Sequence, residues 1–176
     1  MIDAPGLRPT PDRVRETLFN WLGQDLSGWR CLDPFAGSGA LGFEAASRGA
    51  QEVVMIERDP KALAALRAVQ AKLDARAIRL LQGDALALLS SLRRGDHPGF
   101  DLVFLDPPFG QGWLERVLPL VRPLLAPGGL LYLESDGPLE NDLLQGGEPL
   151  RAASAGQVHY HLLRQSNNSD PLSRSR

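Results

Sequence analysis

The sequence predicts an α/β fold in which one mostly parallel β-sheet carries helices on both faces. Short apolar runs of strand length alternate from Trp29 to Glu134 with longer stretches whose apolar residues recur at helical spacing. The connections between these segments are short, which favours parallel strands joined by crossover helices. The run 52–57 is continuously apolar between its two end acids, and this is typical of a parallel strand covered on both sides.

The length and composition fit one globular domain. The chain has 176 residues, of which 43% are apolar and 23% are charged. We expect a single domain over residues 1–164 and a disordered tail over residues 165–176, because the tail contains almost no apolar side chains. A net charge of −2 excludes a protein that coats nucleic acid through bulk positive charge, although it allows a local basic patch.

Several other classes of protein are disfavoured by the residue content. The single cysteine, Cys31, excludes an internal disulfide, and its place in an apolar strand predicts a buried thiol. Three scattered histidines offer no metal-ligand spacing, so no metal is expected. The sequence shows no signal peptide and no apolar run near the ~20 residues of a membrane span, so we expect a cytoplasmic protein without membrane contact.

The individual elements follow from caps and periodicity. The first helix is expected to begin at Thr10-Pro11-Asp12, with Thr10 as the cap and Pro11 at the tolerated first position. Strands are expected at residues 30–35, 52–57, 77–82, 101–105 and 130–134, with a last strand at 157–164 after a loop. Helices are expected after the glycine-rich turn up to Arg48, after Asp59-Pro60, from Ala85, and from Leu114 to Leu125. The buried stripe of the helix after Asp59-Pro60 is expected to be Leu63, Leu66, Val69 or Gln70, and Leu73.

A rigid corner follows the strand at 101–105, in the segment Asp106-Pro107-Pro108-Phe109. Prolines cannot donate to a sheet and disfavour the helical region for the residue before them, so the strand should stop at Asp106. The Asp106 carboxylate and the Pro107 carbonyl can then face one point, with the Phe109 ring beside them as a stacking surface. Two acceptors and a ring suit the amino edge of a nucleobase; the alternative is a strand end followed by a simple Pro-Pro turn.

Four acids, Asp33, Glu57, Asp84 and Asp106, follow the first four predicted strands. The carboxyl ends of parallel strands meet at one edge of the sheet, where ligands of such folds bind. Neighbouring carboxylates repel one another unless a ligand offers donors, and a nucleoside does so. Each acid could instead cap a helix, Asp84 in particular.

A glycine-rich turn lies between the first two acids. The segment Gly37-Ser38-Gly39-Ala40-Leu41-Gly42 fits the G-x-G-x-x-G fingerprint, and Glu57 stands 20 residues after the first glycine, where an acid should meet ribose hydroxyls. Glycines allow a close backbone approach, and the following helix offers free N–H groups. This turn alone is as typical of a nicotinamide enzyme as of any other nucleotide-binding protein.

The acid before the turn discriminates between cofactors. Asp33 would stand close to the anionic pyrophosphate of a dinucleotide, whereas a cationic sulfonium with an amino-acid end is attracted to it. We therefore expect S-adenosylmethionine, with Glu57 on the ribose, Asp84 on the adenine amino group and the Ala85 N–H beside it. The full set of expected cofactor-binding residues is Asp33, Phe35, Gly37, Ser38, Gly39, Glu57, Arg58, Asp84, Ala85 and Asp106.

Three motifs together resemble one family. They are Arg8-Pro9-Thr10 with Asp12-Arg13-Val14-Arg15-Glu16, then Asp33-Pro34-Phe35-Ala36-Gly37-Ser38-Gly39, and Asp106-Pro107-Pro108-Phe109. From Leu7 to Arg164 the chain resembles the RsmD family of bacterial 16S rRNA (guanine-N2)-methyltransferases. The resemblance implies a Rossmann-like class I methyltransferase fold with a seven-stranded sheet whose last strand is antiparallel. It also implies S-adenosylmethionine as donor and a guanine of 16S rRNA, in the RNA or the 30S subunit, as substrate.

The resemblance and the corner together suggest direct methyl transfer to an exocyclic amine. Asp106, Pro107, Pro108 and Phe109 are the expected catalytic residues, with the guanine stacked on Phe109 and no metal or covalent nucleophile. Arg8, Arg13 and Arg15 are expected to bind RNA phosphates, although a solvated helix end is the alternative. We expect a monomer. Adenine-N6 methylation of DNA or RNA, a nicotinamide oxidoreductase and a binding scaffold remain alternative functions.

The chain departs from the family at its start. Family members usually carry a further basic, strand-forming segment before the Arg-Pro-Thr motif, and here the chain begins almost at that motif. We expect this to weaken RNA binding while leaving folding and cofactor binding intact.

Overall fold

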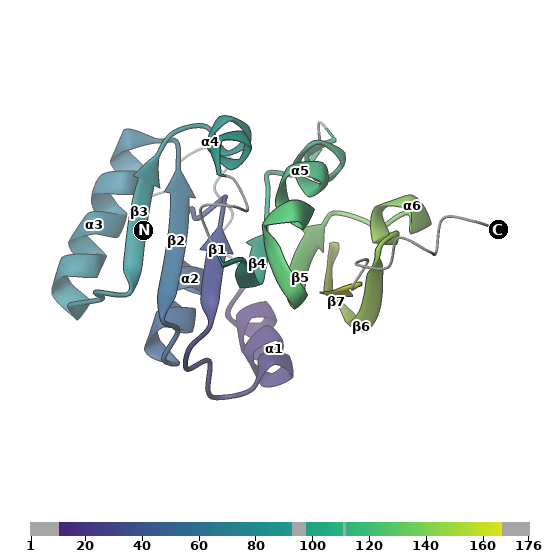
Figure 1. The fold of residues 1–176 in the computed structure, drawn as a ribbon, viewed down its shortest axis with the longest axis horizontal. Coiled ribbons are helices and arrows are strands. Elements are labelled where there is room, and N and C mark those ends of the chain that lie inside the picture. The colour runs from purple at the N-terminus through teal and green to yellow at the C-terminus, as the bar shows by residue number, and fades with distance from the viewer. Residues whose placement is uncertain (1–10, 93–97, 111, 167–176) are drawn as a thin grey trace.

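The computed structural model describes residues 11–92, 98–110 and 112–166, which form a seven-stranded sheet in the order β3-β2-β1-β4-β5-β7-β6 (Figure 1). The strands are β1 Arg30–Asp33, β2 Glu52–Glu57, β3 Ile78–Gln82, β4 Phe100–Leu105, β5 Leu125–Ser135, β6 Gly147–Ala155 and β7 Val158–Gln165. The helices are α1 Asp12–Leu22, α2 Ala40–Ser47, α3 Pro60–Leu73, α4 Ala85–Ser91, α5 Trp113–Val121 with the 3₁₀ turn Arg122–Leu124, and α6 Asn141–Leu144.

Strand direction confirms the predicted sheet. Strands β1 to β5 pair in parallel, and the last strand, β7, is antiparallel to both of its neighbours, β5 and β6. The chain enters the sheet at β1, runs outward through β2 and β3, and then returns to pair β4 on the other side of β1. The strand order therefore reverses between β1 and β4, and Asp33 and Asp106 stand at their carboxyl ends. Ligands of open α/β sheets bind at this reversal point.

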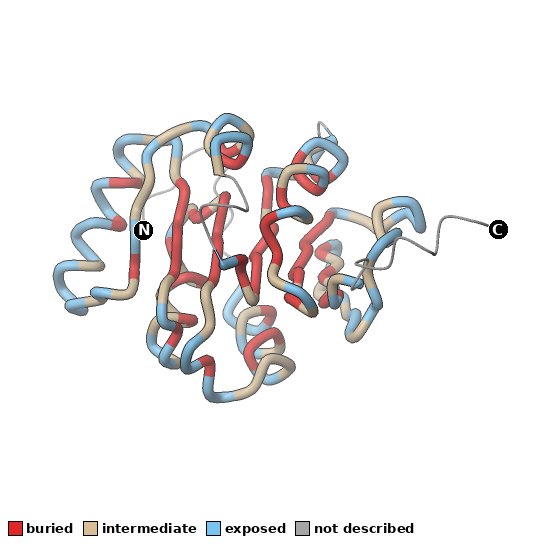
Figure 2. The backbone as a smooth tube through the Cα atoms, in the orientation of Figure 1, coloured by how far each residue is buried: buried red, intermediate tan, exposed pale blue. Residues whose placement is uncertain are grey.

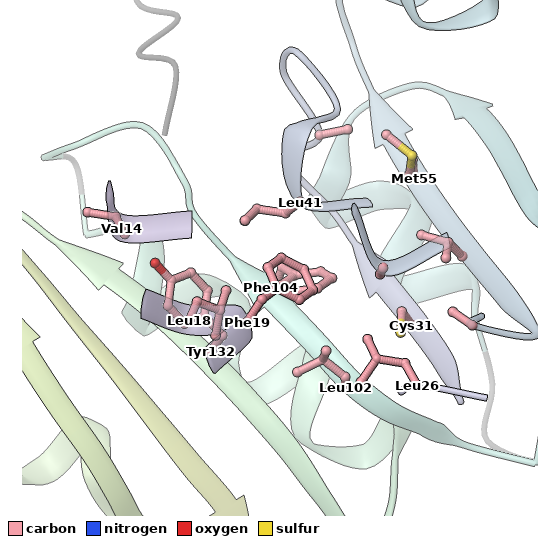
Figure 3. Close-up of a cluster of buried hydrophobic side chains, with 14 of the residues drawn as sticks. Val14, Leu18, Phe19, Leu26, Cys31, Leu41, Met55, Leu102, Phe104 and Tyr132 are labelled. Atoms are coloured by element: carbon pink, nitrogen blue, oxygen red, sulfur yellow. The ribbon is translucent and has the colours of Figure 1, made fainter. Parts of the chain in front are cut away.

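Alternate residues along the central strands enter two apolar clusters, one on each face of the sheet. Phe104 and Tyr132 pack in the first cluster with α1, α2 and α3, whereas Val103 and Leu133 pack in the second with α4 and α5. Figure 2 shows that the central strands are the most deeply buried part of the chain, and Figure 3 shows Phe104 at the centre of the first cluster, near Phe19 and Leu102. Cys31 is buried there, as its place in an apolar strand predicted.

The region after β5 differs from the prediction. Residues expected to form a loop contain the short helix α6 and the strand β6. None of the β6 residues is buried, and its pairing shifts register between Pro149 and Arg151. An edge strand without a buried face leaves no apolar alternation in the sequence, which explains why the strand was missed. The sheet nevertheless has the seven strands that the family resemblance implied.

One buried stripe and two element boundaries also need correction. In α3, Leu63 and Leu66 are buried, but Val69 and Leu73 are 37% and 59% exposed. The helix expected to reach Leu125 ends earlier, because β5 already begins at that residue. Gln165, expected in a disordered tail, is the last residue of β7; residues 167–176 lie outside the described residues.

The first helix begins one residue later than predicted. Pro11 is its N-cap, and the Pro11 carbonyl accepts from the Val14 and Arg15 amides at 2.9 and 3.1 Å. Thr10, the expected cap, lies outside the described residues. None of the helices in the described part of the chain is long and apolar enough to cross a membrane.

Candidate active site

A cavity of about 550 Å³ opens at the carboxyl ends of β1, β2 and β4. Its volume lies within the ~300–1,000 Å³ range of small-molecule sites. Every described residue of the predicted site except Gly39, Arg13 and Arg15 lines this cavity: Asp33, Phe35, Gly37, Ser38, Glu57, Arg58, Asp84, Ala85, Asp106, Pro107, Pro108 and Phe109. The topology thus brings the glycine turn, the strand-end acids and the proline corner to one place.

Asp33 is a buried acid at the wall of this cavity. It is 2% exposed, and among the described residues its Oδ1 atom has no hydrogen-bond partner. Burial, followed by the nearby Asp106 carboxylate, raises the pKa of Asp33 to about 8. An orphaned buried carboxyl oxygen is costly, so this position favours a ligand that supplies a positive charge or an N–H donor.

Glycines in the turn allow α2 to pack tightly against the sheet. Gly39, the N-cap of α2, is left-handed with φ of 81°, and a Cβ there would lie 2.6 Å from both Leu66 and Phe43. A Cβ at Gly42 would lie 2.7 Å from the Met55 sulfur on β2. Gly39 and Gly42 therefore fix the shape of the turn, while Gly37 and Ser38 face the cavity.

Glu57 holds the turn and lines the cavity at the same time. Its Oε2 atom accepts from the Gly37 amide at 3.0 Å, and its Oε1 atom accepts from the Asp59 amide at 2.9 Å. Each carboxylate oxygen can accept a further bond, so these contacts leave capacity for ribose hydroxyls.

Asp84 caps helix α4, which was the alternative role considered for this acid from the sequence. The residue is exposed, and its Oδ1 atom accepts from the Ala87 amide at 2.9 Å at the start of α4. Asp84 nevertheless lines the cavity together with the buried Ala85, and the exposed Arg58 lies on the same rim.

The corner after β4 separates two cavities. Asp106 and Phe109 are half-buried, Pro107 is buried and Pro108 is exposed. A second cavity of about 260 Å³ lies beside the first and shares Pro107, Pro108, Phe109, Trp113 and Glu134 with it. Phe109 also packs against the apolar cluster that contains α1. The corner can therefore be reached from two sides.

Glu134 is a site residue that the sequence reading missed. It is 3% exposed at the end of β5, accepts a short hydrogen bond from the Tyr132 hydroxyl, and lines both cavities. Burial raises the pKa of Glu134 to about 8, and the charge of Asp106 and a hydrogen bond with it act in the same direction. The rule that pointed to the other acids, a carboxylate at the end of a parallel strand, would have identified Glu134 as well.

Trp113 was also missed, because it lies outside every motif. Its ring meets Phe35 edge-on, with centroids 5.5 Å apart, and the Arg116 guanidinium lies 4.8 Å from its centroid. Trp113 lines both cavities and therefore belongs to the wall that they share with the corner. An aromatic residue at the start of the helix after the corner was the available signal.

Two of the predicted RNA-binding arginines, Arg13 and Arg15, lie on α1, whose N-cap Pro11 lines the first cavity. Arg13 is exposed, and Arg15 forms an ion pair with Asp12 at 3.1 Å. Arg8 lies outside the described residues. Within residues 11–92, 98–110 and 112–166, no cluster of three or more His, Cys, Asp or Glu side chains suits a metal ion.

Comparison with known proteins adds an independent line of evidence. The family model described as conserved hypothetical protein 95 matches residues 1–164. A relative from Escherichia coli (strain K12), named ribosomal RNA small subunit methyltransferase D, is 44% identical over 165 residues, covering 91% of this chain and 80% of the relative. A protein of the same name from Haemophilus influenzae is 39% identical over 171 residues, covering 92% of this chain and 85% of the relative.

Solved structures agree with these matches. A putative methyltransferase from Escherichia coli has a TM-score of 0.79 and 40% identity, covering 94% of this chain and 91% of that chain. A precorrin-6y methyltransferase from Geobacter metallireducens, at 21% identity and a TM-score of 0.67, shares the fold. Because the family model and the relatives cover most of its length, the chain belongs to the RsmD family of methyltransferases.

Proposed function

We propose that this protein transfers the methyl group of S-adenosylmethionine to the N2 amine of a guanine in 16S ribosomal RNA. The observation that carries the proposal is one cavity lined both by the orphaned carboxyl of Asp33 and by the acceptor corner at Asp106. The names of the relatives support a small-subunit RNA as the substrate.

The cofactor half of the cavity fits S-adenosylmethionine better than a dinucleotide. When bound, S-adenosylmethionine supplies an electrophilic methyl group on a positively charged sulfur. Asp33 gives that charge and the amino group a buried partner, and Glu57 can accept from ribose hydroxyls. A pyrophosphate would need the Gly37 amide that Glu57 already holds, and it would meet the charge of Glu57. Asp84 and Ala85 line the rim of the cavity, which supports their proposed contact with the adenine.

The corner acts by position and charge. The Asp106 carboxylate and the Pro107 carbonyl accept the two hydrogens of the amine and so aim its lone pair across the cavity. Stacking of the base on the Phe109 ring, worth ~1–3 kcal/mol, offsets part of the cost of flipping the base out of the RNA. Holding the amine in this geometry and stabilising its developing positive charge are the main catalytic contributions.

Arg13 and Arg15 are proposed to contact the RNA backbone. An exposed ion pair such as Arg15–Asp12 contributes ~0–1 kcal/mol, so a phosphate can replace Asp12 at little cost. The net charge of −2 implies a local contact of this kind rather than a broad basic surface.

Transfer of a labelled methyl group to three acceptors tests the proposal. We expect transfer to 16S rRNA or assembling 30S particles and none to duplex DNA. Calorimetry should show binding of S-adenosylhomocysteine and none of NAD. Transfer to DNA alone, or binding of NAD in place of S-adenosylhomocysteine, would contradict the proposal.

A further inference from the structure

Three polar groups form a continuous chain behind the corner. The Tyr132 hydroxyl donates to Glu134 Oε1. Asp106 and Glu134 directly follow Leu105 and Leu133, which are paired between β4 and β5, so their carboxyl groups lie side by side within hydrogen-bond reach. Tyr132 is fully buried, and its ring meets Phe104 edge-on at 6.4 Å between centroids. Because Tyr132 and Glu134 lie two residues apart on β5, their side chains project from the same face of the sheet. The packed ring of Tyr132 therefore fixes the position of the Glu134 carboxyl.

Two carboxyl groups in hydrogen-bond contact must share a proton, because like charges at that separation cannot both ionise in a buried site. The charged groups that act on Glu134 are the acids Asp106 and Asp33, and Tyr160 acts on Tyr132 from the neighbouring strand β7. Burial and the charges of Asp106 and Asp33 favour the protonated form of Glu134, whereas the hydrogen bond from Tyr132 favours its charged form. The pair therefore carries one proton at neutral pH.

We propose that Glu134 is a positioning residue for Asp106: its protonated carboxyl donates to one Asp106 oxygen and turns the other toward the substrate amine. This inference rests on the proposed function of Asp106. It explains why a strand-end acid with 3% exposure lines both cavities on either side of the corner.

Asp106 and Glu134 together can also accept the proton that methyl transfer releases. The nitrogen lone pair forms the new N–C bond, and the electron pair of the broken C–S bond remains on sulfur. The amine nitrogen then gives one proton to Asp106, so the pair passes from one proton to two and returns one to water. No oxidant, metal or further reactant is needed for this balance.

Two substitutions separate positioning from simple packing. Glu134→Gln keeps an N–H donor toward Asp106 but cannot lose a proton, whereas Glu134→Ala removes the donor and leaves the Tyr132 hydroxyl without its acceptor. We expect Glu134→Ala to lower kcat about tenfold or more with little change in KM, and Glu134→Gln to recover most of that loss. Glu148→Gln, an exposed acid on the edge strand β6, is the matched control.

The pH dependence of the methyl-transfer rate distinguishes the two roles, because a Glu134 that served only in packing would not change it. The wild-type rate should fall above pH of about 8, where Glu134 loses the proton that it donates to Asp106. In Glu134→Gln that alkaline fall should disappear or move upward by about one pH unit or more. An unchanged alkaline limb in Glu134→Gln, or a wild-type kcat in Glu134→Ala, would overturn the proposal.

Infrared spectroscopy of the protein without RNA tests the shared proton directly, whatever the substrate proves to be. A protonated carboxyl band at neutral pH should weaken in Glu134→Gln and remain in Glu148→Gln, with Asp33→Asn identifying the separate band of Asp33. A neutral-pH spectrum unchanged by Glu134→Gln would refute the shared proton whether or not 16S rRNA proves to be the substrate. Loss of the band in a protein that fails to methylate rRNA would refute only the proposed function.

Discussion

The proposed cofactor side of the cavity, at Glu57 and Asp84, and the proposed amine side, at Asp106 and Glu134, differ in how their carboxyl groups are held. On the cofactor side, Glu57 and Asp84 accept hydrogen bonds from backbone amides, and these bonds hold the glycine turn and the start of α4. On the proposed amine side, the carboxyl groups of Asp106 and Glu134 lie close together, and the burial of Glu134 favours its protonated form. The first side is organised before any ligand arrives. On the second side, we expect the N–H donors of the bound amine to reduce the repulsion between the carboxyl groups.

Asp33 lies between the two sides and shares features of both. It ends β1 on the proposed cofactor side, yet among charged groups Asp106 raises its pKa most strongly, and one of its oxygens lacks a hydrogen-bond partner among the described residues. The comparison therefore predicts different outcomes on each side: substitutions on the amine side should affect rate, and those on the cofactor side should affect binding and folding.

The largest effect is expected at the corner itself. Asp106→Asn keeps the size of the side chain but replaces an acceptor with an amide donor that faces the amine. We expect kcat to fall by roughly 10²–10³ or more, with S-adenosylhomocysteine binding changed by less than about threefold. Steady-state transfer assays and calorimetry measure the two quantities, with the exposed Asp142→Asn as control. Equal losses of rate and binding would show that the two sides are not separate.

The glycine turn should respond through stability. Gly39→Ala places a Cβ 2.6 Å from Leu66 and Phe43 in a left-handed backbone, so we expect ~2–4 kcal/mol of destabilisation and loss of cofactor binding. Gly137→Ala is the matched control, because its Cβ would meet nothing within 4 Å. Urea denaturation of both variants measures the difference. Equal stability of the two would mean that the turn is not closely packed.

Asp33 offers a pH-dependent test. Its pKa of about 8 in the folded protein lies above its ordinary 3.8, so the folded state binds the proton more tightly. This contribution favours folding most in acid and is lost as pH rises from about 4 to about 8. The free energy of unfolding of Asp33→Asn should therefore exceed that of the wild type by up to ~6 kcal/mol at high pH, with the difference vanishing in acid.

Urea denaturation at several pH values measures that difference, while calorimetry should show weaker S-adenosylhomocysteine binding by Asp33→Asn. A variant that is less stable than the wild type at high pH would show that the buried carboxyl is already satisfied.

The smallest effect is expected outside the cavity. Arg13 is exposed near the start of α1, and Arg13→Ala should weaken RNA binding a few-fold and lower the salt dependence of log K by about one. Rates at saturating RNA should stay unchanged. RNA binding measured at several salt concentrations tests this, and an unaltered slope would remove Arg13 from the interface.

Elements with a strong local pattern of apolar residues were predicted accurately from the sequence. The strand 52–57 was placed to the residue, because its apolar run ends in an acid at each side. Strand β6 was missed because it has no buried face. In the α3 stripe, Leu73 is wrong, and of the two alternatives Val69 and Gln70 it is Gln70 that turns inward, where its amide donates to the Ile78 carbonyl on β3.

Contacts within the site could be predicted only in part. The strand-end rule brought Asp33, Glu57, Asp84 and Asp106 to one edge without knowledge of strand order. The contact between Glu134 and Asp106 depends on the pairing of β4 with β5, and the hydrogen bond from Tyr132 depends on how its ring packs. Neither contact leaves a trace in the sequence, because each arises from tertiary packing.

Nucleoside analysis of the methylated RNA tests the central claim most directly. After reaction with assembling 30S particles and labelled S-adenosylmethionine, digestion and mass spectrometry identify the modified base. The account predicts that the label resides in N2-methylguanosine from 16S rRNA, and that Asp106→Asn yields none. A label in N6-methyladenosine would contradict it.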